Sequence, residues 1–126
     1  MKFNILYIED YPDNMTLVRR IVHASDYTLM EARTGSEGLK IAETEDVDLI
    51  LLDINLPDID GYEVARKLRS SAKREMRRIP IIAVTANALK GDATKALAAG
   101  CNAYLTKPID IQDLLQKIET FKPLPT

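Results

Sequence analysis

The chain of 126 residues is poor in cysteine and histidine, with one of each, and it has no apolar run long enough to cross a membrane. Cys101 alone cannot form an internal disulfide, so a reducing, cytoplasmic setting is expected. A transmembrane helix needs about 20 apolar residues in a row, and a secretory signal needs a basic segment before an apolar one. Since the sequence has neither, it predicts no membrane association.

The sequence also lacks an excess of charge of one sign. Seventeen lysines and arginines stand against nineteen acidic residues, for a net charge of -2, which is not the basic balance of a protein that binds nucleic acid or anionic lipid directly. Five glycines and six prolines are too few for a collagen-like or low-complexity chain. The composition therefore indicates one globular domain, residues 1–121, followed by a short tail, residues 122–126.

Short apolar segments alternate with helical patterns along the chain. The segments of strand length are 3–8, 27–32, 49–52, 79–84 and 103–105. Apolar residues at helical spacing follow the first, second, third and fifth segments, and an alanine-rich helix from Asp92 to just before Gly100 follows the fourth, after a loop at 86–91. The pattern is thus five strands and five helices in strict alternation.

Strict alternation predicts an α/β fold, because right-handed crossovers between parallel strands place helices on both faces of the sheet. The polar segment 27–32 and the short segment 103–105 suit the two edges of a five-stranded parallel sheet. We therefore expect the flavodoxin-like (βα)5 three-layer sandwich, with strand order 2-1-3-4-5. Such sheets bind ligands at the carboxyl ends of the strands, here between the first and third strands.

Polar residues follow four of the predicted strands. Glu9 and Asp10 follow the first, Asp53 the third, Thr85 the fourth and Lys107 the fifth. Clustered carboxylates repel by about 4 kcal/mol per close pair at an effective dielectric near 20, so a cation should join them. Hard oxygen ligands favour Mg²⁺. Beside the ion, Asp53 could attack phosphorus while Lys107 and Thr85 contact the transferred group.

These residues, in this order, resemble the receiver domain of two-component response regulators, the CheY-like family. The matching motifs are Glu9-Asp10, the stretch from Asp53 to Gly61, Thr85-Ala86 and Lys107-Pro108. The resemblance implies that Asp53 accepts a phosphoryl group from a phosphohistidine. It also implies that Asp10, Asp53 and the backbone carbonyl of Asn55 hold Mg²⁺, and that Glu9 assists through water.

The resemblance carries further expectations. Thr85 and Lys107 would contact the phosphoryl oxygens, Thr85 and Tyr104 would move together as a switch, and the Lys107-Pro108 peptide bond would be cis. The partners implied are a histidine kinase or histidine phosphotransfer protein and a downstream protein target, with the chain a monomer or weak dimer. The segments 87–92 and 100–104 are most similar to DivK-type stand-alone receivers and to hybrid-kinase receivers.

Other readings of the same residues stay open. A Mg²⁺-dependent phosphohydrolase would share the aspartyl chemistry but would want a carboxyl group where Asn55 stands. A pseudo-receiver would use the fold only as an interaction scaffold, and a flavin-binding module would need a phosphate loop that the sequence lacks. Tyr104 could be a packed edge-strand aromatic, and Asp58 and Asp60 are expected to form turns and helix caps, with Gly61 permitting a bend.

Overall fold

The computed structural model describes residues 3–86 and 91–123. Its five parallel strands form one sheet in the order β2-β1-β3-β4-β5, which confirms the predicted fold. The strands are β1 (Asn4–Ile8), β2 (Thr28–Ala32), β3 (Leu49–Asp53), β4 (Ile81–Thr85) and β5 (Ala103–Thr106). The helices are α1 (Pro12–Ala24), α2 (Gly35–Thr44), α3 (Gly61–Arg69), α4 (Asp92–Ala99) and α5 (Ile111–Phe121), with a short 3-10 helix, η1 (Arg74–Arg77).

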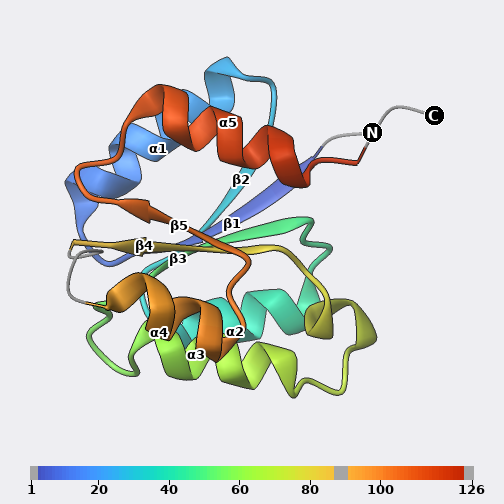
Figure 1. The fold of residues 1–126 in the computed structure, drawn as a ribbon. Coiled ribbons are helices and arrows are strands. Elements are labelled where there is room, and N and C mark those ends of the chain that lie inside the picture. The colour runs from blue at the N-terminus through green and yellow to red at the C-terminus, as the bar shows by residue number, and fades with distance from the viewer. Residues whose placement is uncertain (1–2, 87–90, 124–126) are drawn as a thin grey trace.

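The helices cover both faces of the sheet. Figure 1 shows α1 and α5 on one face and α2, α3 and α4 on the other, while the carboxyl ends of the strands meet at one edge. Alternate residues of a strand point to opposite faces, so each inner strand contributes to two separate cores. Residues of β3 and β4 are all buried, which is why these segments read as continuous apolar runs.

The observed boundaries differ from the predicted ones by one or two residues. β4 begins at Ile81, and the Pro80 carbonyl accepts a hydrogen bond from the Ile50 amide just before it. Helix α4 lies between Gly91 and Gly100, whose φ angles of 87° and 112° are in the left-handed region that glycine tolerates. Helix η1 has no counterpart in the sequence prediction, because its arginine-rich segment has no apolar periodicity.

Aspartate side chains accept amides at the starts of two helices, and Asp60 is the N-cap of α3, as the sequence predicts. The Asp60 side chain accepts the Glu63 amide at the start of α3 at 2.9 Å. The Asp58 side chain accepts the Gly35 amide at 2.8 Å at the start of α2. Gly61 serves a different purpose from the predicted bend: a Cβ there would lie 2.6 Å from the Asp53 carbonyl oxygen, so the position needs the missing side chain.

The single histidine and the single cysteine both lie outside the strand ends that carry the acidic residues. His23 lies in the last turn of α1, where a positive charge is favourable. Cys101 is buried, and burial raises the pKa of its thiol to about 11, which makes it a poor nucleophile. Within residues 3–86 and 91–123, no helix is both long and apolar enough to cross a membrane.

Candidate functional site

Three acidic side chains meet at the carboxyl edge of the sheet. Glu9 and Asp10 follow β1, Asp53 ends the neighbouring β3, and one carboxylate oxygen of each lies within 4.8 Å of the other two. The parallel register pairs Ile8 with Leu52, so the residues that follow them come out side by side. Glu9 and Asp53 are each 1% exposed and Asp10 is exposed. The predicted acidic cluster therefore exists and is mostly removed from water.

The Lys107 ammonium lies between the two buried carboxylates. Its Nζ is 3.2 Å from Glu9 Oε1 and 3.2 Å from Asp53 Oδ1. The Lys107 amide also donates to the Thr85 carbonyl at 2.8 Å, which ties the ends of β5 and β4 together. The peptide bond that follows, Lys107-Pro108, is cis. One ammonium thus offsets part of the charge of two carboxylates.

Glu9 is held by donors that sequence reasoning missed. The Tyr7 hydroxyl donates to Glu9 Oε1 at 3.0 Å, and Asn14 Nδ2 donates to the same oxygen at 2.9 Å. The Tyr11 amide donates to the other oxygen, Oε2, at 3.3 Å. Residues i and i+2 of a strand point to the same face, so a tyrosine two positions before a buried glutamate is the signal that could have revealed this contact. Glu9 Oε1 thus has three donors around it: the Tyr7 hydroxyl, the Asn14 side chain and the Lys107 ammonium.

Burial and mutual repulsion separate the acidities of the two buried carboxyl groups. Burial, together with the hydrogen bond and charge of Glu9, raises the pKa of Asp53 to about 7. For Glu9, burial alone would raise the pKa, but the Asp53 and Asn14 side chains and the Lys107 charge outweigh it and hold that pKa below its usual value. In the absence of a metal ion, Asp53 is therefore the carboxyl group that takes up a proton first.

The donor set fits a hard divalent cation. All the side-chain ligand atoms in the cluster are carboxylate oxygens, and three of them are too few for a Ca²⁺ cage, so Mg²⁺ with water in its shell suits the group. Asn55 lies beside the cluster, and its backbone N–H donates to Asp53 Oδ1 at 3.2 Å. Its side chain is exposed. Asp10 and Asp53 thus lie close together, with the Asn55 backbone next to Asp53; that the Asn55 carbonyl holds the ion stays a prediction.

Thr85 lies at the neighbouring strand end but is turned to another partner. Its hydroxyl donates to Asp92 Oδ2 at 2.8 Å, and the side chain is 1% exposed. Tyr104, on the edge strand β5, is 38% exposed and lines a hollow between α4 and α5. The segment from Asn87 to Lys90, which includes part of the DivK-like motif, lies outside the residues that the structure describes.

Comparison with known proteins decides the family. The model of the response regulator receiver domain matches residues 5–119. This chain belongs to that family. Residue by residue, DivK, the polar-differentiation response regulator of Brucella ovis, is 40% identical over 121 residues, which are 96% of this chain and 97% of DivK. The predicted resemblance is confirmed, and the chain is a receiver domain of two-component signalling.

Two solved receiver structures are close in both fold and sequence. The receiver domain of the sensor histidine kinase PA1611 from Pseudomonas aeruginosa PAO1, described with a magnesium ion coordinated in its active site cleft, has a TM-score of 0.88 and 36% identity, covering 96% of this chain and 98% of that one. A chain from the Saccharomyces cerevisiae complex of the phosphotransfer protein Ypd1 with the Ssk1 receiver domain has a TM-score of 0.87 and 31% identity, covering 95% and 88%.

Proposed function

We propose that Asp53 is the phosphoryl acceptor of this response regulator, and that the donor is the phosphohistidine of a histidine kinase or histidine phosphotransfer protein. The observation that carries the proposal is the position of the Asp53 carboxylate. It is buried, it lies 3.2 Å from the Lys107 ammonium, and it adjoins the carboxylates of Glu9 and Asp10. A nucleophile for phosphoryl transfer needs this combination of a fixed oxygen and neighbouring positive charge.

The transfer makes an acyl phosphate. An oxygen of Asp53 attacks phosphorus while the bond from phosphorus to the donor's imidazole nitrogen breaks, and that nitrogen keeps the electron pair. Lys107, already 3.2 Å from Asp53, neutralises charge on the phosphoryl oxygens. Asp10, Asp53 and the Asn55 backbone carbonyl would hold Mg²⁺, with Glu9 assisting through water. A bound Mg²⁺ would supply charge neutralisation at the same oxygens.

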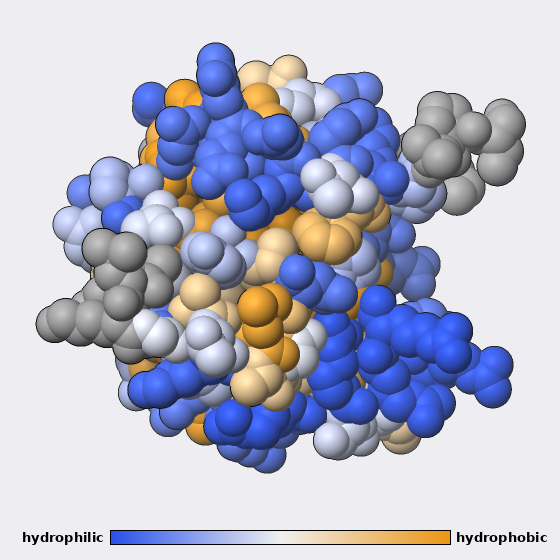
Figure 2. Space-filling model, viewed as in Figure 1, coloured by the Kyte–Doolittle hydropathy of each residue, from blue (hydrophilic) through white to orange (hydrophobic). Residues whose placement is uncertain are grey.

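The output would be a change in a protein-binding surface. The face formed by α4, β5 and α5 carries a hollow of about 480 Å³, and Leu97 and Tyr104 on it are 51% and 38% exposed. Figure 2 shows apolar residues near the centre of the view, with hydrophilic residues above and below them. Movement of Thr85 toward the phosphoryl group, with Tyr104 following, would alter this face for a downstream protein.

The proposal includes what the chain does not do. Its only chemistry would be its own phosphorylation and dephosphorylation, since Asn55, an exposed amide, stands where a phosphohydrolase of this type would need a carboxyl group. We place this activity in the cytoplasm, where a lone buried thiol such as Cys101 stays reduced. We expect no direct contact with nucleic acid or membrane, and a monomer or weak dimer.

Incubation with acetyl phosphate and Mg²⁺, followed by intact mass measurement, tests this function. The wild type should gain one phosphoryl group, and Asp53→Asn should gain none. Asp48→Asn, at the opposite end of β3, is the matched control and should behave as the wild type. Continuous turnover of the phosphodonor without a lasting mass gain would instead indicate a phosphohydrolase. No reaction at all would indicate a scaffold.

A further inference from the structure

The Thr85 hydroxyl is engaged by a carboxylate that belongs to neither the acidic cluster nor the proposed metal site. We propose that Asp92 is a positioning residue that holds this hydroxyl away from Asp53 in the unphosphorylated protein and so sets how readily the receiver switches. The inference rests on the proposed function, because it requires a phosphoryl group on Asp53 that competes for the same hydrogen.

The hydrogen bond from Thr85 to Asp92 is a strong one, because its acceptor is a carboxylate. A threonine hydroxyl has one hydrogen to donate, and here it goes to Asp92 Oδ2 at 2.8 Å. Hydrogen bonds to an ionised acceptor are shorter and about twice as strong as those between neutral groups. Thr85 is 1% exposed, so water competes weakly for the contact. The hydroxyl must leave Asp92 before it can donate to a phosphoryl oxygen.

The Asp92 carboxylate is fixed by its surroundings. Asp92 is the first residue of α4, where the unpaired amides and the helix dipole favour a negative charge. Its other oxygen, Oδ1, accepts the Tyr62 hydroxyl from α3 at 3.3 Å. Asp92 therefore connects the end of β4 with the start of α4 and the first turn of α3. Release of Thr85 removes a side-chain contact between the end of β4 and the start of α4.

The competition has a definite thermodynamic sign. A ligand that favours one of two states binds more tightly when the other state is destabilised. The contact between Thr85 and Asp92 stabilises only the unphosphorylated arrangement. Its removal should therefore strengthen binding of a phosphoryl mimic, whereas loss of a residue that merely supports the fold should weaken that binding.

Beryllofluoride, which mimics a phosphoryl group on a carboxylate, provides the measurement. Its affinity in the presence of Mg²⁺ is determined by calorimetry for the wild type, Asp92→Asn and Asp92→Ala. We expect roughly tenfold tighter binding for Asp92→Ala, and an intermediate value for Asp92→Asn, whose amide oxygen still accepts a hydrogen bond but carries no charge. Glu63→Ala, which removes a half-exposed acid from the first turn of α3, is the control and should leave the affinity unchanged.

A second background isolates the hydroxyl. In Thr85→Ala the hydrogen in dispute is absent, so adding Asp92→Ala should have no further effect on the affinity. Equal or weaker binding by both Asp92 variants, or the same gain in the Thr85→Ala background, would overturn the inference. If the wild type itself shows no binding that depends on Asp53, the proposed function fails instead, so the two failures can be told apart.

Discussion

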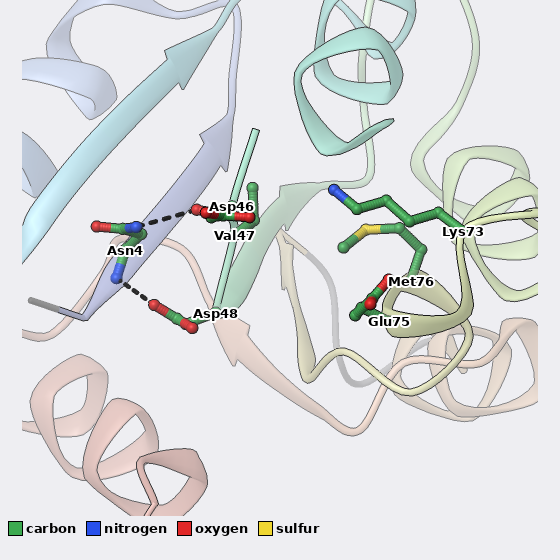
Figure 3. A pocket seen from close by; sticks show the side chains of 7 residues that line it. All are labelled: Asn4, Asp46, Val47, Asp48, Lys73, Glu75 and Met76. Atoms are coloured by element: carbon green, nitrogen blue, oxygen red, sulfur yellow. Dashed lines mark hydrogen bonds between the residues drawn. The ribbon is translucent and has the colours of Figure 1, made fainter. Parts of the chain in front are cut away.

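The two ends of the sheet each carry acidic residues and a lysine, but they use them differently. At the carboxyl ends of the strands, the carboxylates of Glu9 and Asp53 are buried against each other. At the amino ends there is a hollow of about 530 Å³, which Figure 3 shows from close by. Its lining residues are Asn4, Asp46, Val47, Asp48, Lys73, Glu75 and Met76.

Polar groups at the amino end bond to backbone partners and are half-buried or exposed to water. Asp48 accepts the Asn4 amide at 2.7 Å, and Lys73 Nζ donates to the carbonyl oxygens of Ala42 and Glu45 at 3.0 and 2.8 Å. These contacts hold together the chain segments at the amino ends of the strands. The carboxyl end instead keeps two carboxylates, those of Glu9 and Asp53, away from water beside one ammonium. The difference between the two ends is thus the burial of like charges, which only the carboxyl end shows among the described residues.

The largest effect expected from this comparison is the stability of Asp53→Asn. In EDTA at pH 8, the substitution should raise the free energy of unfolding by about 2–4 kcal/mol, because it removes a buried charge that repels Glu9. Asp10→Asn, at an exposed position, should stabilise less, and Asp48→Asn at the amino end should not stabilise. Urea denaturation measures all three. A loss of stability in Asp53→Asn would show that Lys107 already compensates the cluster.

The same repulsion predicts an unusual dependence on pH. The pKa of Asp53 is raised to about 7 in the folded chain, so between about pH 4 and 7 the folded state binds more protons than the unfolded state at this residue, and stability falls as pH rises. The lowered pKa of Glu9 acts in the opposite sense but below about pH 4.5. Melting temperatures in EDTA from pH 5 to 8 should decline in the wild type and stay nearly flat in Asp53→Asn.

Tyr7→Phe should have a smaller effect on stability. It leaves the buried Glu9 oxygen with one donor fewer, which costs about 1–3 kcal/mol. Tyr27→Phe is the matched control, because the Tyr27 hydroxyl contacts Glu119 at an exposed position, and it should cost under about 0.5 kcal/mol. Equal losses of stability in the two variants would mean that the buried Tyr7 hydroxyl stabilises the carboxyl end no more than an exposed hydroxyl would.

Lys73→Met tests the amino end with the smallest expected change. Loss of the ammonium leaves two partly exposed carbonyl oxygens to water, at a cost of about 1 kcal/mol. Binding of Mg²⁺, measured by calorimetry, should stay within about twofold of the wild type, since no contact links Lys73 to the acidic cluster in residues 3–86 and 91–123. A large drop in Mg²⁺ affinity would erase the distinction between the two ends.

The sheet order and the closeness of the acidic residues could be predicted from the sequence, because both follow from the alternation of strands and helices and from the parallel direction of the strands. The sequence does not show contacts that depend on tertiary packing. Thr85 could be assigned to a strand end, but the turn of its hydroxyl toward Asp92 depends on where α4 begins. Likewise, the phenol of Tyr7 reads as an apolar strand residue until the strand's neighbours are known. The proposed roles of the site residues remain predictions.

Gly61 limits which sequences can ever occupy this fold. An added Cβ would come within 2.7 Å of the Ile54 Cα as well as meeting the end of β3, and backbone atoms cannot move aside as a flexible side chain can. Even alanine would therefore push the chain around Asp53 out of place. Variants that alter the rate of phosphorylation can therefore be sought at the exposed Asn55. At Gly61, no other residue fits.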